Sequence, residues 1–189
     1  MTQNSRFTPP SMLKNPHIQS ILNSLGPRKI RAKRLANKLD SEILTLTAKD
    51  GTRLLAEYDR SKTPNNSLIV LLHGWEGSSQ SAYQVTTANY LLKQGFDVLR
   101  LNLRDHGDSH HLNFELFNST MTNEVAEAIA CFFETHAYEK RFLAGFSLGG
   151  NFTLRIAADH GSSLKLTAAV AICPPVDPTN AMTALDNTL

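Results

Sequence analysis

The chain has 189 residues, a length that suits one domain, and its 41% hydrophobic and 19% charged residues are ordinary for a globular protein. The longest apolar runs, at residues 68–72 and 168–173, are strand-sized, and none approaches the length needed to span a membrane. The net charge of +2 conceals an asymmetry: residues 1–39 hold eight Lys or Arg and no acidic residue, whereas residues 40–189 hold eleven against seventeen Asp or Glu. The N-terminus lacks the apolar stretch of a signal peptide, so we expect a cytoplasmic protein.

Cysteine and histidine usage predicts no metal site. Cys131 and Cys173 stand in apolar stretches without zinc-ligand spacing, and we expect buried free thiols in a reducing compartment. His110 and His111 are adjacent and would point different ways on a regular element, so we interpret them as loop residues.

Residues 1–40 are predicted to form a basic N-terminal arm, irregular and partly helical, which Pro9-Pro10 and Asn15-Pro16 interrupt early. A short helix is predicted at residues 17–25. Six basic residues lie between Arg28 and Lys38, and such a cluster can attract phosphate groups or, weakly, an anionic membrane surface. It can also be a solvated linker or helix face. No aromatic residue interleaves it, which argues against a nucleic-acid partner.

From residue 41 onward, predicted strands and helices alternate. A hairpin comes first, with strands at 43–46 and 53–58 joined by the Asp50-Gly51 turn. The apolar run at 67–72 predicts a strand covered on both faces. The remaining predicted elements are a helix at 80–94, a strand at 97–101, a polar loop at 102–118, a helix at 123–136, a strand at 141–145, a helix at 151–160 and a strand at 166–173. This order predicts an α/β fold, a mostly parallel sheet with helices on both faces.

Two of these helices have clear apolar positions. In the helix at 123–136 one face carries Val125, Ile129, Phe132 and Phe133. In the helix at 151–160 the apolar positions are Phe152, Leu154, Ile156, Ala157 and Ala158.

The sequence Gly-Phe-Ser-Leu-Gly at residues 145–149 matches the pattern that holds a nucleophilic serine on a sharp strand-to-helix turn. Such a turn lifts the Ser147 hydroxyl clear of the backbone, and side chains at Gly145 and Gly149 would clash there. The flanking strand and helix favour a nucleophile over a solvated serine in a glycine-rich turn.

A serine hydrolase also needs donors for the oxyanion that forms when a carbonyl is attacked. In this pattern one donor is the backbone N–H after the nucleophile, here that of Leu148, and the other comes from the loop after the buried strand. That loop is His-Gly-Trp-Glu-Gly at residues 73–77, in which Gly74 lets the backbone turn and Trp75 is the predicted second donor. We expect His73 to brace this loop rather than to act in catalysis.

A second loop, residues 104–109, is predicted to form a structured turn near the site. Asp105 and His106 lie in it, but chain order argues against a triad built from them, because the acid and histidine follow the serine in such enzymes.

Three motifs resemble the α/β-hydrolase superfamily: the loop at 73–77, Asn-Leu-Arg-Asp-His-Gly at 102–107, and Gly-Phe-Ser-Leu-Gly-Gly-Asn at 145–151. The arm, with Phe-Thr-Pro-Pro at 7–10 and Asn-Pro-His-Ile-Gln-Ser at 15–20, is similar to the N-terminal signature of the YheT-like branch of hydrolases and esterases. The resemblance implies an α/β-hydrolase fold, activity on small carboxylic (acyl) esters with Ser147 as nucleophile, and no cofactor.

The chain departs from that family after Ser147. The acids and histidine that follow are Asp159, His160, Asp177 and Asp186. Asp159 and His160 would sit at the far end of a helix, roughly 20 Å from the serine at about 1.5 Å per residue. Asp177 could lie near the mouth of the site, but no histidine accompanies it.

The resemblance therefore implies that residues 41–189 form an incomplete core, with the C-terminal strands and cap missing and an exposed apolar edge at 166–173. We expect the N-terminal portion of a longer hydrolase, inactive or weak as an isolated chain because no histidine activates the serine. The alternatives are a non-catalytic binding or scaffold protein that retains the fold, and another acyl transfer such as peptidase or thioesterase chemistry.

Overall fold

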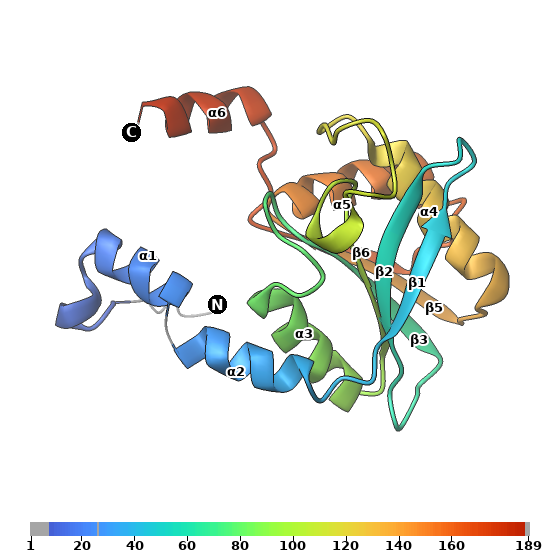
Figure 1. The fold of residues 1–189 in the computed structure, drawn as a ribbon, viewed down its shortest axis with the longest axis horizontal. Helices are drawn as coiled ribbons and strands as arrows, with labels where there is room; N and C mark the ends of the chain where they lie inside the picture. The colour runs from blue at the N-terminus through green and yellow to red at the C-terminus, as the bar shows by residue number, and fades with distance from the viewer. Residues whose placement is uncertain (1–7, 26, 188–189) are drawn as a thin grey trace, which may run out of the picture.

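The computed structural model describes residues 8–25 and 27–187 (Figure 1). The N-terminal elements are η1 (Ser11–Leu13), α1 (Pro16–Leu25) and α2 (Pro27–Ala36). The core elements are β1 (Glu42–Thr47), β2 (Arg53–Asp59), β3 (Ser67–Leu72), α3 (Ala82–Lys93), β4 (Asp97–Leu101), η2 (Gly107–Ser109), α4 (Thr122–Thr135), β5 (Lys140–Phe146), α5 (Leu148–His160), β6 (Ala168–Ile172) and α6 (Pro178–Asp186). In the described part of the chain, no helix is both long and apolar enough to cross a bilayer.

The six strands form one sheet in the order β1-β2-β4-β3-β5-β6. The hairpin strands β1 and β2 are antiparallel, and β2 also runs antiparallel to β4. The strands β4, β3, β5 and β6 are parallel to one another. The predicted α/β class with a mostly parallel sheet is confirmed, and the parallel strands bring the loops after β3, β4 and β5 to one edge.

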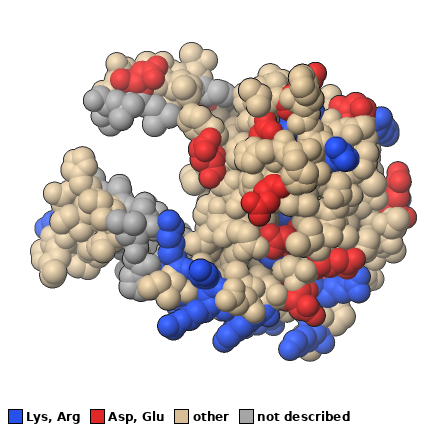
Figure 2. Space-filling view, in the orientation of Figure 1, with Lys and Arg blue, Asp and Glu red and all other residues tan. Residues whose placement is uncertain are grey.

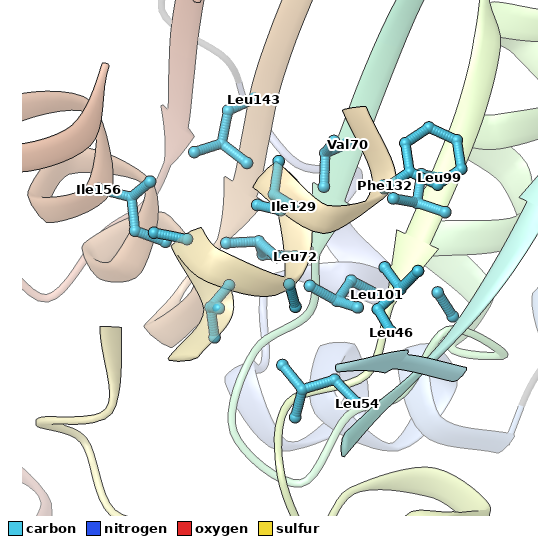
Figure 3. Close-up of a cluster of buried hydrophobic side chains, with 14 of the residues drawn as sticks. Leu46, Leu54, Val70, Leu72, Leu99, Leu101, Ile129, Phe132, Leu143 and Ile156 are labelled. Carbon is cyan, nitrogen blue, oxygen red and sulfur yellow. The ribbon is translucent and has the colours of Figure 1, made fainter. Parts of the chain in front are cut away.

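Helices cover both faces of the sheet because the central strand is apolar on both. Leu68, Val70 and Leu72 of β3 belong to the large core cluster that includes residues of α4 and α5 (Figure 3). Leu71, from the other face of β3, packs in a second cluster with Ala88 of α3. The prediction of a doubly covered strand at 67–72 is therefore confirmed.

The predicted apolar face of α4 is confirmed, since all four of its named residues are buried. In α5, Phe152 and Ile156 are fully buried, whereas Leu154, another of its apolar positions, is 42% exposed. Residues four apart share a helix face, whereas position 154 lies two residues from each and points away from the sheet.

The arm is more helical than the sequence analysis predicts. Pro16 and Pro27 each begin a helix rather than interrupt one, because the first helical position needs no N–H donor. The Asn15 side chain accepts a hydrogen bond from the His17 backbone N–H at 2.9 Å, which caps α1. The second helix, α2, packs against α3, with Ala32 buried.

Strand β6 lies at the sheet edge and pairs, within the described residues, only with β5. Its Val170 and Ile172 are 53% and 40% exposed, which agrees with the predicted apolar edge. The prediction of buried thiols is wrong: Cys173 directly follows this edge and is exposed, and Cys131 is only half-buried. The cytoplasmic compartment inferred partly from these residues stays a prediction.

Candidate active site

Ser147 is the single residue between the end of β5 at Phe146 and the start of α5 at Leu148. Its φ of 52° and ψ of −118° are strained for a residue with a side chain. Its N–H donates to the Ile172 carbonyl at 2.9 Å, and its carbonyl accepts from the Asn151 N–H at 3.0 Å. The residue is exposed, so the bend presents the hydroxyl to solvent on a fixed backbone.

Neither Gly145 nor Gly149 has a positive φ, so their backbone angles do not require glycine. Glycine is required there because a side chain would clash with neighbouring backbone atoms. A Cβ on Gly145 would lie 2.1 Å from the Gly149 carbonyl oxygen, and a Cβ on Gly149 would lie 2.3 Å from the His73 carbonyl oxygen. The backbone of α5 thus passes directly beside β5 and the end of β3. The clash predicted from the sequence is present, and the unusual angles fall on the serine itself.

The loop after β3 lies against the serine. A Cβ on Gly74 would come within 3.2 Å of the Ser147 Cβ and 3.3 Å of the Phe146 carbonyl oxygen. The Gly74 N–H donates to the Tyr83 hydroxyl at 2.9 Å, and the Tyr83 ring packs on Phe146 with centroids 4.8 Å apart. Gly74 therefore allows the close approach of the two segments.

The backbone N–H groups of Trp75 and Leu148, the two predicted donors, have no acceptor among the described residues. Leu148 is the first residue of α5, where helix geometry leaves the N–H free and the helix dipole is positive. Trp75 follows Gly74, and its side chain is 61% exposed. This arrangement is able to stabilise negative charge that develops near Ser147.

His73 braces the loop, as the sequence analysis predicts. The side chain is fully buried; Nδ1 lies 2.7 Å from the Gly74 carbonyl oxygen, and Nε2 accepts from the Leu103 N–H at 3.0 Å. Burial, aided by the nearby His106 ring, lowers the pKa of His73 to about 4 despite the bond to Gly74. Both nitrogens are engaged, so His73 is not free to accept a proton from serine.

The loop after β4 is also held by its own contacts. The Asp105 carboxylate accepts from the Phe117 N–H at 2.8 Å, and His106 Nδ1 lies 2.7 Å from the Arg104 carbonyl oxygen. Across from the loop at 73–77, the two loops line a cavity of about 310 Å³. Its lining includes Trp75, Glu76, His106, Leu116 and Phe117.

A buried network of charged side chains holds the loop at residues 73–80 through Ser79, and it was not predicted from the sequence. Arg100 is fully buried in β4 and forms ion pairs with Glu57 at 2.8 Å and Asp59 at 2.9 Å. It also donates to the Ser79 carbonyl at 2.8 Å. The Ser79 hydroxyl donates to Glu57 at 2.6 Å, and the Ser79 N–H donates to Asn102 at 2.8 Å. The available signal was an arginine between the apolar residues Leu99 and Leu101 of a buried strand.

Among the described residues, the Ser147 hydroxyl has no hydrogen-bond partner. His160 lies at the opposite end of α5 and is 3.0 Å from the Asn123 side chain. Asp177 accepts hydrogen bonds from Asn180 at 3.1 Å and 2.6 Å and so caps α6. The described residues therefore bring the loop that contains Gly74 against the serine, and no acid–histidine pair among them accompanies it.

Comparison with known proteins places these features in context. A family model for the alpha/beta hydrolase fold matches residues 67–188. YheT of Escherichia coli (strain K12), whose name marks it as a candidate esterase, is 22% identical over 174 residues, or 92% of this chain and 50% of that protein. The Pyrococcus furiosus esterase Pf2001 superposes with a TM-score of 0.65 at 19% identity, over 77% of this chain and 55% of that one.

XC6422 of Xanthomonas campestris, described as an α/β serine hydrolase without a lid, gives a TM-score of 0.62 at 23% identity, over 73% of this chain and 63% of that one. At these identities the structural likeness concerns the fold. The chain spans half or less of the length of the curated relatives it matches.

Proposed function

Because this chain belongs to the α/β-hydrolase fold family, we propose that it is the nucleophile-bearing part of a hydrolase that acts on carboxylic (acyl) esters. In the proposed reaction the Ser147 oxygen attacks the ester carbonyl carbon and its proton passes to a base. The alcohol leaves with a proton, and water then hydrolyses the acyl-serine ester to release the acid and regenerate the hydroxyl. These steps need no cofactor.

The observation that carries the proposal is the exposed, strained Ser147 at the start of α5, with the loop that contains Gly74 packed against it. When the carbonyl oxygen becomes an oxyanion, the N–H groups of Trp75 and Leu148 would donate to it. They are held in place before the reaction, Trp75 by the His73 brace and Leu148 by α5, so little reorganisation is needed.

The cavity beside the site supports a small ester as the substrate. Trp75, Leu116 and Phe117 supply the apolar part of its lining, which would contact an acyl or alkyl group, and polar side chains such as Asp105 and His110 line the rest. Peptidase or thioesterase chemistry would use the same serine and the same donors, so ester specificity is part of the proposal.

We expect low turnover from the chain of 189 residues. Without a histidine at the hydroxyl, Ser147 stays protonated and attacks poorly, and only the oxyanion donors and substrate binding contribute. The same observation favours a second candidate, a binding or scaffold protein that retains the fold without catalysis.

Chemical rescue separates the two candidates. Hydrolysis of p-nitrophenyl acetate is measured with increasing imidazole, which supplies an external base, for the native chain and for Ser147→Ala. The variant reports the background reaction of imidazole with the ester. We expect the native chain to exceed the variant by about tenfold or more, a part of the roughly 100-fold to 10,000-fold that a positioned base provides.

Equal rates for the native chain and Ser147→Ala at every imidazole concentration would reject the serine as nucleophile and favour the scaffold. Mass spectrometry of the chain quenched during turnover gives a second readout, because an acetyl group should be found on the peptide that contains Ser147 and be absent in the variant.

A further inference from the structure

We propose that α1 and α2 form a docking surface for anionic phospholipid, with a headgroup phosphate held between α2 and α3. This surface is separate from Ser147 and does not depend on the ester chemistry. Its parts are a basic side of α2, a polar pocket beside it and an exposed aliphatic face on α1.

The basic side of α2 consists of five exposed cations: Lys29, Arg31, Lys33 and Arg34 in the helix, and Lys38 two residues after its end. Among the described residues none of the five forms an ion pair with a carboxylate. The side chain of Arg28, which belongs to the cluster predicted from the sequence, lies outside the described residues. Figure 2 shows Lys and Arg gathered along the lower left of the molecule, over α2 and its neighbours. A surface so short of acidic groups complements an anionic one.

A pocket of about 430 Å³ opens between α2 and α3 on this side. Arg31 and Lys93 line it from the two helices, together with Thr86, Asn89 and Tyr90, and no carboxylate lines it. Two cations with neighbouring polar side chains are the groups that bind a phosphate monoester or diester. The contact between α2 and α3, which buries Ala32, keeps Arg31 and Lys93 on opposite walls of this pocket.

The exposed aliphatic face of α1 favours lipid over a soluble polyanion. Ile18, Ile21 and Leu22 follow helical spacing i, i+3 and i+4, so they share one face, and they are 42%, 56% and 49% exposed. Figure 1 shows α1 standing away from the sheet. A nucleic acid or free phosphate gains nothing from such a face, whereas an aliphatic face beside Lys and Arg is typical of helices that lie in the membrane interface.

The first test measures sedimentation of the full chain with vesicles of phosphatidylcholine, with and without a third of phosphatidylglycerol. We expect binding to the anionic vesicles only, and weaker binding as salt is raised. In the triple variant Lys29→Gln, Lys33→Gln, Arg34→Gln we expect a loss of about 100-fold, since each cation near the surface contributes about fivefold.

The matched control removes the same charge elsewhere, through Lys49→Gln, Lys140→Gln and Lys165→Gln, all exposed positions outside the arm. We expect this control to bind within several-fold of the native chain. An equal loss of vesicle binding in both triple variants would show that only the net charge of the chain matters, and would overturn the proposed surface. Equal binding of the native chain to neutral and anionic vesicles would also overturn it.

The second test separates lipid from other polyanions. Ile21→Ser with Leu22→Ser keeps every charge, and we expect it to weaken vesicle binding about tenfold while binding of heparin or a short RNA is unchanged. Leu154→Ser, at a leucine on α5 that is 42% exposed, serves as the control and should change neither. If the α1 variant bound vesicles as well as the native chain does, and the native chain bound RNA as tightly as vesicles, the surface would be a general polyanion site. That result would contradict the proposal.

Discussion

Ser147 combines an exposed hydroxyl with a backbone conformation that residues with a side chain rarely adopt. Two backbone hydrogen bonds maintain this strained conformation: the Ser147 N–H donates to the Ile172 carbonyl, and the Asn151 N–H donates to the Ser147 carbonyl. Such strain costs about 1–3 kcal/mol and persists only where the surroundings enforce it. The conformation is therefore a measurable property of the elbow, whatever the rate of catalysis.

We expect Ser147→Gly to raise the free energy of unfolding by about 1 kcal/mol, because glycine adopts a positive φ without strain and loses only part of that gain to backbone entropy. Ser147→Ala keeps the strain and should leave stability nearly unchanged. Urea unfolding of the two variants checks this. If alanine and glycine gave equal stabilities, residue 147 would not be strained.

Gly149 gives the sharpest steric prediction, because a methyl group there meets the His73 and Leu72 carbonyl oxygens at 2.3 Å and 2.6 Å. We expect Gly149→Ala to lower the free energy of unfolding by at least about 3 kcal/mol, since α5 would have to move from β3.

The control for this prediction is the next residue of the same helix. A Cβ on Gly150 has its nearest neighbour at 3.2 Å, and alanine gains about 1 kcal/mol of helix propensity over glycine. Gly150→Ala should therefore be close to neutral in the same urea experiment. Similar losses for both variants would contradict the close approach of α5 and β3.

At the scale of elements, His73 links the end of β3 to the loop after β4. Its pKa of about 4 in the folded chain lies below the value of about 6.5 expected when unfolded. The unfolded chain therefore takes up the proton first as pH falls. The stability that neutral His73 contributes is complete above about pH 6.5 and is lost progressively toward pH 4.

The difference between the folded and unfolded pKa values of His73 corresponds to about 3 kcal/mol of unfolding free energy between about pH 6.5 and pH 4. We expect His73→Phe to remove this part of the pH dependence. His160→Gln, at a partly exposed histidine, should keep it. Chemical denaturation of the three proteins between pH 7 and pH 4 is the measurement. Parallel curves for the native chain and His73→Phe would mean that His73 is not buried in its neutral form.

Arg100 makes the second link between elements, because it ties β2 and β4 to the loop that carries Trp75. We expect Arg100→Met to cost about 3–5 kcal/mol of unfolding free energy, since Glu57 and Asp59 stay buried without their cation. Adding Glu57→Gln and Asp59→Asn should restore much of the loss.

The exposed pair of Arg60 and Glu42 provides the comparison, and Arg60→Met should have little effect. Urea unfolding checks all of these variants. A small loss for Arg100→Met, equal to that for Arg60→Met, would contradict the network.

The strongly patterned elements could be predicted from the sequence. The strand at 97–101 has the observed bounds, and the apolar face of α4 is the predicted one. The start of α5 could not be predicted from the sequence, because Gly149 and Gly150 are poor helix formers. They occur in this helix because α5 packs closely against β3 and β5. Pro16, which the sequence predicts to interrupt the arm, instead begins α1, because the first helical position needs no N–H donor.

The candidate site divides in the same way. The elbow and the loop at 73–77 are contiguous motifs, so their residues could be named from the sequence, and the structure brings Gly74 against Ser147. The Arg100 network could not be named. It depends on the pairing of Glu57 opposite Arg100, which follows from the placement of β2 beside β4 rather than from adjacency in the chain.

On the scale of the whole molecule, the parallel strands place the loops after β3, β4 and β5 at one sheet edge, where Ser147 lies. The basic residues concentrate away from this site. All charged residues among the N-terminal 39 are Lys or Arg, whereas residues 40–189 hold more acidic than basic residues. The uneven charge gives the molecule one side suited to anionic surfaces, independent of the edge that carries the serine.

The central claim is that the fold presents the Ser147 hydroxyl to the N–H groups of Trp75 and Leu148. A crystal structure of the chain soaked with an alkyl boronic acid tests it most directly, because boron adds to a serine oxygen and forms a tetrahedral mimic of the reaction intermediate. We predict a boron–oxygen bond at Ser147, with one boronate oxygen about 2.7–3.1 Å from both nitrogens. A boronate bound elsewhere, or bound to Ser147 with its oxygens facing neither N–H group, would contradict the account.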